Sequence, residues 1–257
     1  MSARLPVPDL VIGGAPRSGT TFLAEILDKH PQIFVARPIA PEPKVCLRDH
    51  PEGMAGYLAE YARYFTGAPA NALRVEKTTN YFENEAAVGR LAAVLPQARF
   101  LFILREPVAR AYSNWRWSTM NKLETLSFAE AVELEGQRPN PFGKEREAAR
   151  PFDYMSRSRY GTLAARWYAL FDHKRIRFVV FEDLIQDPEY VLSDLQAWLG
   201  VEPLSWAALR MGRINPAPED ASGLDPALRQ RLRTEIQAEV AEFGRISGLN
   251  VTAWGYP

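Results

Sequence analysis

The sequence lacks the features of several common classes of protein. Cys46 is the only cysteine among 257 residues, which excludes an intramolecular disulfide and favours a reducing compartment, the cytoplasm. Zinc sites built from paired cysteines are excluded for the same reason. The 31 lysines and arginines balance the 31 aspartates and glutamates, so the chain lacks the basic excess of a nucleic-acid-binding protein. Any anion site must therefore be a local cluster of cations.

Long apolar runs are also missing. The apolar run before Gly13 is too short for a signal peptide or a membrane span, so we expect no membrane partner. Apolar residues nevertheless make up 47% of the chain and charged residues 24%, which indicates a folded core rather than a disordered chain. The length suits one domain over residues 1–257. The oligomeric state cannot be predicted from this sequence.

Predicted strands and helices alternate along the chain. Apolar runs predict buried strands at residues 10–12, 99–104 and 177–181. Helical spacing of apolar residues and helix-capping signals predict seven helices, at 21–30, 83–95, 106–117, from 127 onward, 158–171, 187–199 and 225–243. Residues 136–155, rich in Pro, Gly, Arg and Glu, predict a long loop. This order predicts an α/β fold, with a P-loop-like central parallel β-sheet flanked by helices on both faces.

The first predicted strand leads into a glycine-rich loop, Gly14-Ala-Pro-Arg-Ser-Gly-Thr-Thr21. Between a strand and a helix, such a loop binds phosphate through backbone N–H groups and the helix dipole. Thr20 occupies the position of the lysine of nucleoside-triphosphate-binding loops, and the cation lies inside the loop, at Arg17. A sulfuryl group carries less charge than a terminal phosphoryl group, so hydrogen bonds and one or two cations suffice for its transfer. We therefore expect a site without metal.

The run PRSGTTFLAEILDKHP resembles the 5′-phosphosulfate-binding loop of sulfotransferases that use 3′-phosphoadenosine-5′-phosphosulfate (PAPS). The similarity is to the branch that contains the heparan sulfate N- and O-sulfotransferases and their bacterial relatives, and it covers residues 9–245 with the motifs in the family's order. It implies that PAPS is the co-substrate and that Arg17 contacts the 5′-phosphate and the bridging oxygen. The same loop implies further N–H and O–H donors at Ser18, Gly19, Thr20 and Thr21.

A second anchor follows the strand predicted at 99–104. Arg105 stands at its carboxyl end, where ligands bind in open α/β sheets. An arginine can bind a phosphate bidentately, and a serine hydroxyl can donate one more hydrogen bond. The stretch REPVARAYSNW resembles the family's 3′-phosphate motif, which implies that Arg105 and Ser113 hold the 3′-phosphate of the donor. The resemblance further implies a place near the donor nucleotide for Tyr160 and a donor-covering basic loop at Arg213.

The reaction needs a general base, because the acceptor loses a proton as it attacks sulfur. Glu42 lies in a segment that resembles the family's Lys-Glu-Pro-like motif, whose glutamate is the catalytic base. Here Pro41 replaces the lysine, and we expect Lys44 to supply the nearby cation. Of the three histidines, His50 lies in a predicted loop and stays an alternative base.

The segment Val75-Glu-Lys-Thr-Thr-Asn-Tyr-Phe82 resembles the family's Glu-Lys-(Ser/Thr)-Pro-x-Tyr-Phe motif. The resemblance implies that Lys77 faces the acceptor or the transferred group and stabilises charge in the transition state. Thr79 takes the place of the usual proline.

The predicted function is transfer of a sulfuryl group from PAPS to a hydroxyl of a small metabolite or saccharide, by in-line displacement with Glu42 as base. O-sulfation is favoured over N-sulfation. The zero net charge favours a small neutral acceptor over a long polyanionic one. One alternative is a nucleotide kinase or NTPase that uses the same loop, with Glu182 and Asp183 as its nearest metal-binding candidates. Another is a non-catalytic nucleotide-binding protein.

Overall fold

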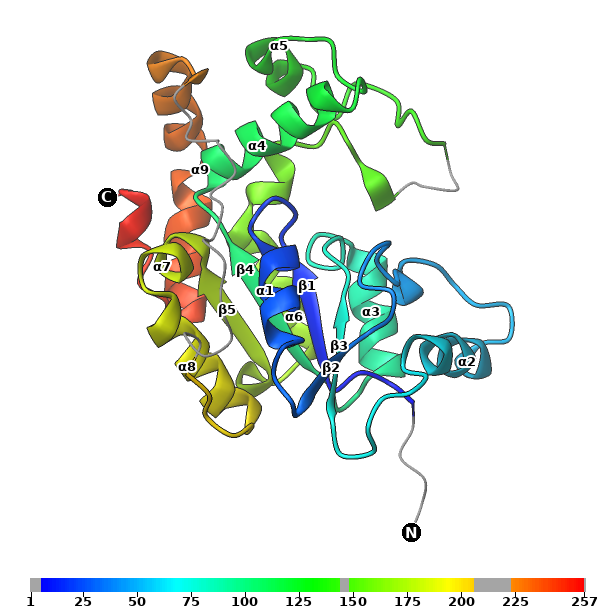
Figure 1. The fold of residues 1–257 in the computed structure, drawn as a ribbon. Helices are drawn as coiled ribbons and strands as arrows, with labels where there is room; N and C mark the ends of the chain where they lie inside the picture. Colours follow the sequence, from blue (N-terminus) through cyan, green and yellow to red (C-terminus); the bar gives the residue numbers. More distant parts are fainter. Residues whose placement is uncertain (1–5, 144–147, 206–222, 257) are drawn as a thin grey trace.

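The computed structural model describes residues 6–143, 148–205 and 223–256. At its centre is a five-stranded sheet in the order β2-β3-β1-β4-β5 (Figure 1). The strands are β1 (Leu10–Gly14), β2 (Ile33–Val35), β3 (Leu73–Lys77), β4 (Arg99–Leu104) and β5 (Ile176–Val180). Every pairing is parallel, so the carboxyl ends of all strands meet at one edge of the sheet, the upper edge in Figure 1.

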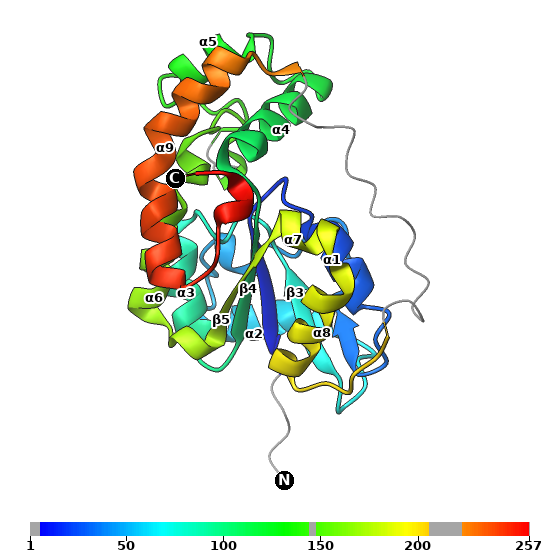
Figure 2. The same ribbon diagram turned by 90° about the vertical axis from the view of Figure 1, so that its left-hand side faces the viewer.

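Helices cover both faces of this sheet, as predicted. One face is packed against α1 (Thr20–Leu27), α7 (Phe181–Gln186) and α8 (Pro188–Leu199). The other face is packed against α2 (Met54–Tyr64), α3 (Glu85–Val94), α6 (Tyr160–Leu170) and α9 (Pro226–Ser247). Two further helices, α4 (Pro107–Met120) and α5 (Phe128–Glu133), extend beyond the carboxyl edge of the sheet (Figure 2).

The position of β4 inside the sheet, between β1 and β5, explains why its residues 100–104 are all apolar. Phe100 and Phe102 belong to the core on the α6 face, whereas Leu101 belongs to the core on the α1 face. Trp167 of α6 packs its ring on both phenylalanines, with centroids 5.0 and 4.6 Å apart. A strand buried on both faces needs apolar side chains in both directions, and this one delivers the chain to the carboxyl edge at a fixed position.

The three predicted strands and the seven predicted helices are present, with small shifts at their ends. Phe181 begins α7 instead of ending β5, and α1 ends at Leu27 rather than at residue 30. The helix predicted from residue 127 onward begins with a capping box between Ser127 and Glu130. The predicted stop of α8 at Gly200 is confirmed, because this glycine adopts the left-handed conformation that ends a helix.

Two strands and two α-helices of the described residues were not predicted: β2, β3, α2 and α7. Strand β2 has only three residues, too few for a periodic signal. Three of the five residues of β3 are charged, so no apolar run marks it, yet its Glu76 and Lys77 are buried. Within the described residues, no helix is both long and apolar enough to cross a membrane.

A buried polar cluster surrounds Glu76 of β3. The carboxylate is fully buried and accepts hydrogen bonds of 2.7 Å from the hydroxyls of both Tyr61 and Tyr81. Thr78 donates a third bond, of 2.9 Å. Burial is the largest influence on this group and raises the pKa of the Glu76 carboxyl to about 7, against the opposing effect of the three hydroxyl donors.

The same hydroxyls hold the chain segment that follows Glu42. The Tyr81 hydroxyl accepts the backbone N–H of Cys46 at 3.0 Å, and the Thr78 hydroxyl accepts that of Lys44 at 3.0 Å. Glu76 therefore fixes the segment 44–46 through two intermediates. Cys46 itself is buried, and burial raises the pKa of its thiol to about 12, so the thiol stays neutral and unreactive.

Glu76 should make stability depend on pH. Between the ordinary carboxyl pKa of 4.5 and the raised value of about 7, the folded protein binds this proton more tightly than the unfolded chain, so a rising pH favours unfolding. In Glu76→Gln this loss, on the order of 3 kcal/mol, should be absent. Urea unfolding between pH 4.5 and 7.5 measures it, with Glu25→Gln on the exposed face of α1 as the control. Equal pH slopes for wild type and Glu76→Gln would contradict the prediction.

Candidate functional site

The predicted anion loop connects β1 to α1 at the carboxyl edge of the sheet. Gly19 precedes α1 with a φ of 85°, and a Cβ there would lie 2.8 Å from the Phe181 ring, so the position requires glycine. Arg17 also has a positive φ, of 71°. Helix α1 has no acidic residue in its first turn and no side-chain cap, so within the described structure its N-terminal N–H groups remain to bind an anion.

Ser18 supplies the most direct indication of a ligand. Its hydroxyl is buried and has no hydrogen-bond partner among the residues that the structure describes. A buried polar group without a partner costs about 1–3 kcal/mol, so the position favours a bound acceptor oxygen. The loop thus combines an unsatisfied hydroxyl, a helix N-terminus and a cation, and this combination fits the 5′-phosphosulfate of the expected donor.

The two predicted anion sites lie side by side. Arg17 Nε donates to Ser113 Oγ at 3.4 Å, which joins the loop to α4 across 96 residues of sequence. Arg105 follows directly after β4, and its guanidinium lies 5.3 Å from the centroid of the Phe181 ring, the same ring that limits Gly19. Arg17, Arg105 and Ser113 therefore gather at the edge of the sheet where the sequence predicted them.

Tyr160 contacts the backbone of Arg105 from the core of the protein. Its ring is fully buried, and its hydroxyl donates to the carbonyl oxygen of Arg105 at 2.9 Å. Burial also raises the pKa of the Tyr160 hydroxyl, so it remains a donor. The described contact is with the backbone of the arginine, which means that Tyr160 positions Arg105. Arg213, predicted in a loop over the donor, lies outside the described residues.

The predicted base and the predicted cation form an ion pair beside the loop. Glu42 Oε1 lies 3.2 Å from Lys77 Nζ, at the end of β3. The same ammonium donates to Thr21 Oγ1 at 3.1 Å, in the first turn of α1. Lys77 is only 4% exposed, so both contacts are needed to offset the cost of burying its charge. The structure thus brings Glu42, Lys77 and Thr21 into one connected group.

Thr79 completes this group, although its sequence pattern had predicted no role for it. Its backbone N–H lies 3.3 Å from Glu42 Oε2, and its hydroxyl lies 3.1 and 3.3 Å from the two carboxylate oxygens. The one sequence signal for Thr79 was its place in the motif around Lys77, where it replaces the usual proline. Glu76 belongs to the same motif, and its role was not predicted either.

The structure separates His50 from this group. Its Nε2 lies 2.9 Å from Glu60 on α2, an ion-pair distance without hydrogen-bond geometry, and its ring packs on Tyr57 of the same helix. The side chain lines a cavity formed with α2. Glu42, and not His50, is the candidate base that contacts both Lys77 and Thr79.

A cavity of about 700 Å³ begins next to the Glu42 segment. Lys44, two residues after Glu42, and Asn80, next to Thr79, both line it. Its walls carry more cations than anions: Lys44, Arg48, Arg90, Arg150 and Arg166 against Glu83 and Glu85. Three of the arginines are paired with carboxylates that do not line the cavity, namely Asp49, Glu60 and Asp153. Lys44 has no ion-pair partner in the described parts of the chain, so it is the cation best placed to meet a ligand.

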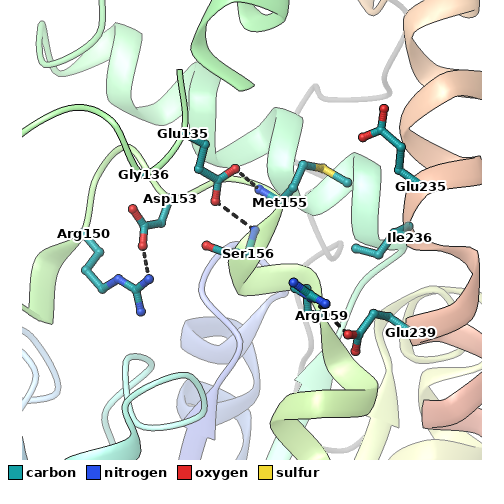
Figure 3. A pocket seen from close by; sticks show the side chains of 10 residues that line it. All are labelled: Glu135, Gly136, Arg150, Asp153, Met155, Ser156, Arg159, Glu235, Ile236 and Glu239. Atoms are coloured by element: carbon teal, nitrogen blue, oxygen red, sulfur yellow. Dashed lines mark hydrogen bonds and ion pairs between the residues drawn. The ribbon is translucent and has the colours of Figure 1, made fainter. Parts of the chain in front are cut away.

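Another cavity, of about 510 Å³, lies between the loop predicted at residues 136–155 and α9 (Figure 3). Its wall is rich in carboxylates and contains none of the predicted site residues. Glu135, at the start of the loop, accepts the backbone N–H groups of Met155 and Ser156 at 2.7 and 2.8 Å (Figure 3). This contact closes the base of the loop 136–155 and gives it a structural role.

No group of three or more histidines, cysteines and carboxylates is arranged to hold a metal ion within the described residues.

Known proteins with similar sequences include two sulfotransferases that act on heparan sulfate. Human heparan sulfate glucosamine 3-O-sulfotransferase 3B1 is 26% identical over 196 residues, which cover 76% of this chain and 47% of that protein. The bifunctional heparan sulfate N-deacetylase/N-sulfotransferase 1 of Caenorhabditis briggsae is 28% identical over 201 residues, 75% of this chain and 22% of that protein. This chain therefore spans less than half the length of either relative.

Solved structures show the same fold. A sulfotransferase from Alicyclobacillus acidocaldarius superposes with a TM-score of 0.76 at 24% identity, over 96% of this chain and 98% of that one. Mouse sulfotransferase SULT7A1, complexed with PAP, superposes with a TM-score of 0.61 at 17% identity, over 95% of this chain and 87% of that one. The sequence model of the sulfotransferase domain matches residues 7–207. That match covers most of the chain and every described residue of the two anion sites, and the chain belongs to the sulfotransferase family.

Proposed function

We propose that this protein transfers a sulfuryl group from PAPS to an acceptor hydroxyl. The contact between Arg17 and Ser113 carries the proposal, because it joins an anion site at the first loop to a second one at the end of β4. Two adjacent anion sites fit a donor with phosphates at its 3′ and 5′ positions. The related mouse structure holds PAP, a ligand of this kind.

The donor residues divide between the two sites. The 5′-phosphosulfate meets Arg17, the Ser18 hydroxyl and the N-terminus of α1, with Thr20 and Thr21 in its first turn. The 3′-phosphate meets Arg105 and Ser113. PAPS supplies an activated sulfuryl group whose leaving group is the 5′-phosphate. Because the chain has no net charge, this local set of cations and hydrogen-bond donors is what selects PAPS.

Glu42 and Lys77 serve the acceptor. Glu42 takes the proton of the acceptor hydroxyl as the oxygen attacks sulfur. Lys77 lies between this carboxylate and Thr21 of the donor site, 3.2 and 3.1 Å from the two side chains. An ammonium at that place stabilises negative charge that develops between acceptor and donor in the transition state.

The acceptor binds in the cavity that Lys44 and Asn80 line. Because cations outnumber carboxylates in its wall, the geometry favours a hydroxylated small molecule or saccharide with an acidic group, in place of the neutral acceptor predicted from the net charge. A protonated amine is disfavoured by the same cations. This supports O-sulfation, although the relatives include both an N-sulfotransferase and a 3-O-sulfotransferase.

The kinase alternative is not favoured. Glu182, one of its two candidate metal ligands, accepts the Glu106 backbone N–H at 3.0 Å and the Trp254 indole N–H at 2.7 Å. Burial raises the pKa of this carboxyl. Both oxygens of Glu182 thus stabilise the fold.

The single domain over residues 1–257 stays a prediction, which Phe243 of α9 supports by its full burial in the core. The cytoplasmic location, which was inferred from the single cysteine, also stays a prediction.

Formation of PAP from PAPS tests the activity directly. We expect radiolabelled sulfate to reach at least one hydroxylated acceptor in the presence of EDTA. A panel with matched neutral and acidic members, such as glucose and glucuronic acid, should give the higher kcat/KM for the acidic ones. A strict requirement for Mg²⁺ together with consumption of ATP would refute the proposal.

Arg105→Ala should separate the two phosphates of the donor. The loss of a charge-assisted contact should weaken binding of PAP by about tenfold to a hundredfold, while adenosine 5′-monophosphate, which lacks the 3′-phosphate, should lose less than about threefold. Calorimetric titration of both ligands measures this. Arg245→Ala, an exposed arginine on α9 paired with Glu242, is the matched control and should bind both ligands normally. An equal loss for both ligands would rule out Arg105 as the 3′-phosphate anchor.

Glu42→Gln should remove the base and spare the donor site. We expect kcat to fall by about 10²–10⁴-fold and the affinity for PAP to stay unchanged. Steady-state kinetics and PAP titration are the measurements, with Glu25→Gln as control. Turnover close to that of wild type would mean that another group is the base, and His50→Ala would then be the next variant.

A further inference from the structure

We infer that Thr79 is a positioning residue that holds the Glu42 carboxylate against Lys77 and toward the acceptor. The inference deepens the proposed function and rests on Glu42 being its base.

The hydrogen-bond geometry is the first support. Both donors of Thr79 reach the carboxylate: its N–H lies 3.3 Å from Oε2, and its hydroxyl oxygen lies 3.1 Å from Oε1. Lys77 approaches the same Oε1 at 3.2 Å. One ammonium fixes the distance of a carboxylate but leaves its plane free to rotate. Donors on both oxygens fix that plane, and a general base works only when its free lone pair points at the proton.

The backbone around Thr79 is itself rigid, which a positioning group requires. Two backbone bonds tie its neighbours to β1, from Thr78 N to Ile12 O at 3.0 Å and from Phe82 N to Gly13 O at 2.9 Å. The Thr79 carbonyl also packs on Gly14, where an added Cβ would lie only 3.0 Å from that oxygen. Thr79 therefore cannot shift without disturbing the start of the anion loop.

The Glu42 segment needs such a restraint. Glu42 lies outside every helix and strand, between two prolines. The neighbouring N–H groups of Lys44 and Cys46 are held from Thr78 and Tyr81, but those bonds act after Glu42 and leave its side chain free. In the described structure the carboxylate itself is held by Thr79 and Lys77.

Thr79→Val tests the inference because valine keeps the shape and the backbone N–H and removes only the hydroxyl. We expect kcat to fall by about tenfold or more, with the KM for PAPS and the affinity for PAP unchanged. Thr79→Ser restores the hydroxyl and should keep kcat within about threefold of wild type. In the Glu42→Gln background, Thr79→Val should have no further effect, because its action passes through the missing carboxylate.

Two outcomes would overturn the inference. One is a kcat of Thr79→Val equal to that of wild type. The other is an equal further loss in the Glu42→Gln background, which would show an action independent of the carboxylate. Failure of the proposed function gives a different result, namely no sulfuryl transfer by the wild type. In that case crystal structures of wild type and Thr79→Val still decide: a Glu42 carboxylate that keeps its place beside Lys77 without the hydroxyl refutes the inference.

Discussion

The Lys77 ammonium is the charge around which the site is arranged. It is 4% exposed at the end of β3, and a buried ammonium costs several kcal/mol unless it is paired and hydrogen-bonded. Its own strand offers no counter-charge on that face, so the partners come from elsewhere: Glu42 from the segment after β2, and Thr21 from α1. The requirement of one charge thereby brings together the proposed base, Glu42, and the predicted anion loop, which are distant in sequence.

The alternation of side chains along β3 creates two polar clusters from adjacent residues. Lys77 points to the face of α1 and reaches the site, whereas Glu76 points to the opposite face and lies among Tyr61 and Tyr81. The Glu76 cluster then returns to the site indirectly, because its hydroxyls hold the backbone at Lys44 and Cys46. A single strand end thus organises both the proposed catalytic side chains and the support of the segment that carries Glu42.

Sequence alone predicted the parts whose signal is local. The loop with Arg17 and the strand that precedes Arg105 are each encoded in one contiguous run, with strong apolar patterning beside it, and both were predicted. Strand β3 was missed because its buried charged residues, Glu76 and Lys77, are paired by partners up to 56 residues away in sequence. The same reason hid Thr79 and Glu76: their roles depend on contacts with the segment 42–46, and no pattern within one element reveals such contacts.

Pro41 and Thr79 both depart from the family-like motifs, and the second departure compensates for the first. The motif similar to that of Glu42 has a lysine where this chain has Pro41, and the motif similar to that of Lys77 has a proline where this chain has Thr79. Residue 41 is exposed, and an ion pair there contributes about 0–1 kcal/mol. Hydrogen bonds to a charged group contribute about 1.5–3 kcal/mol, and a proline at 79 would provide neither the N–H nor the hydroxyl that Glu42 accepts. Replacing an exposed cation by two donors on rigid backbone therefore preserves the stabilisation of the carboxylate and adds control of its orientation.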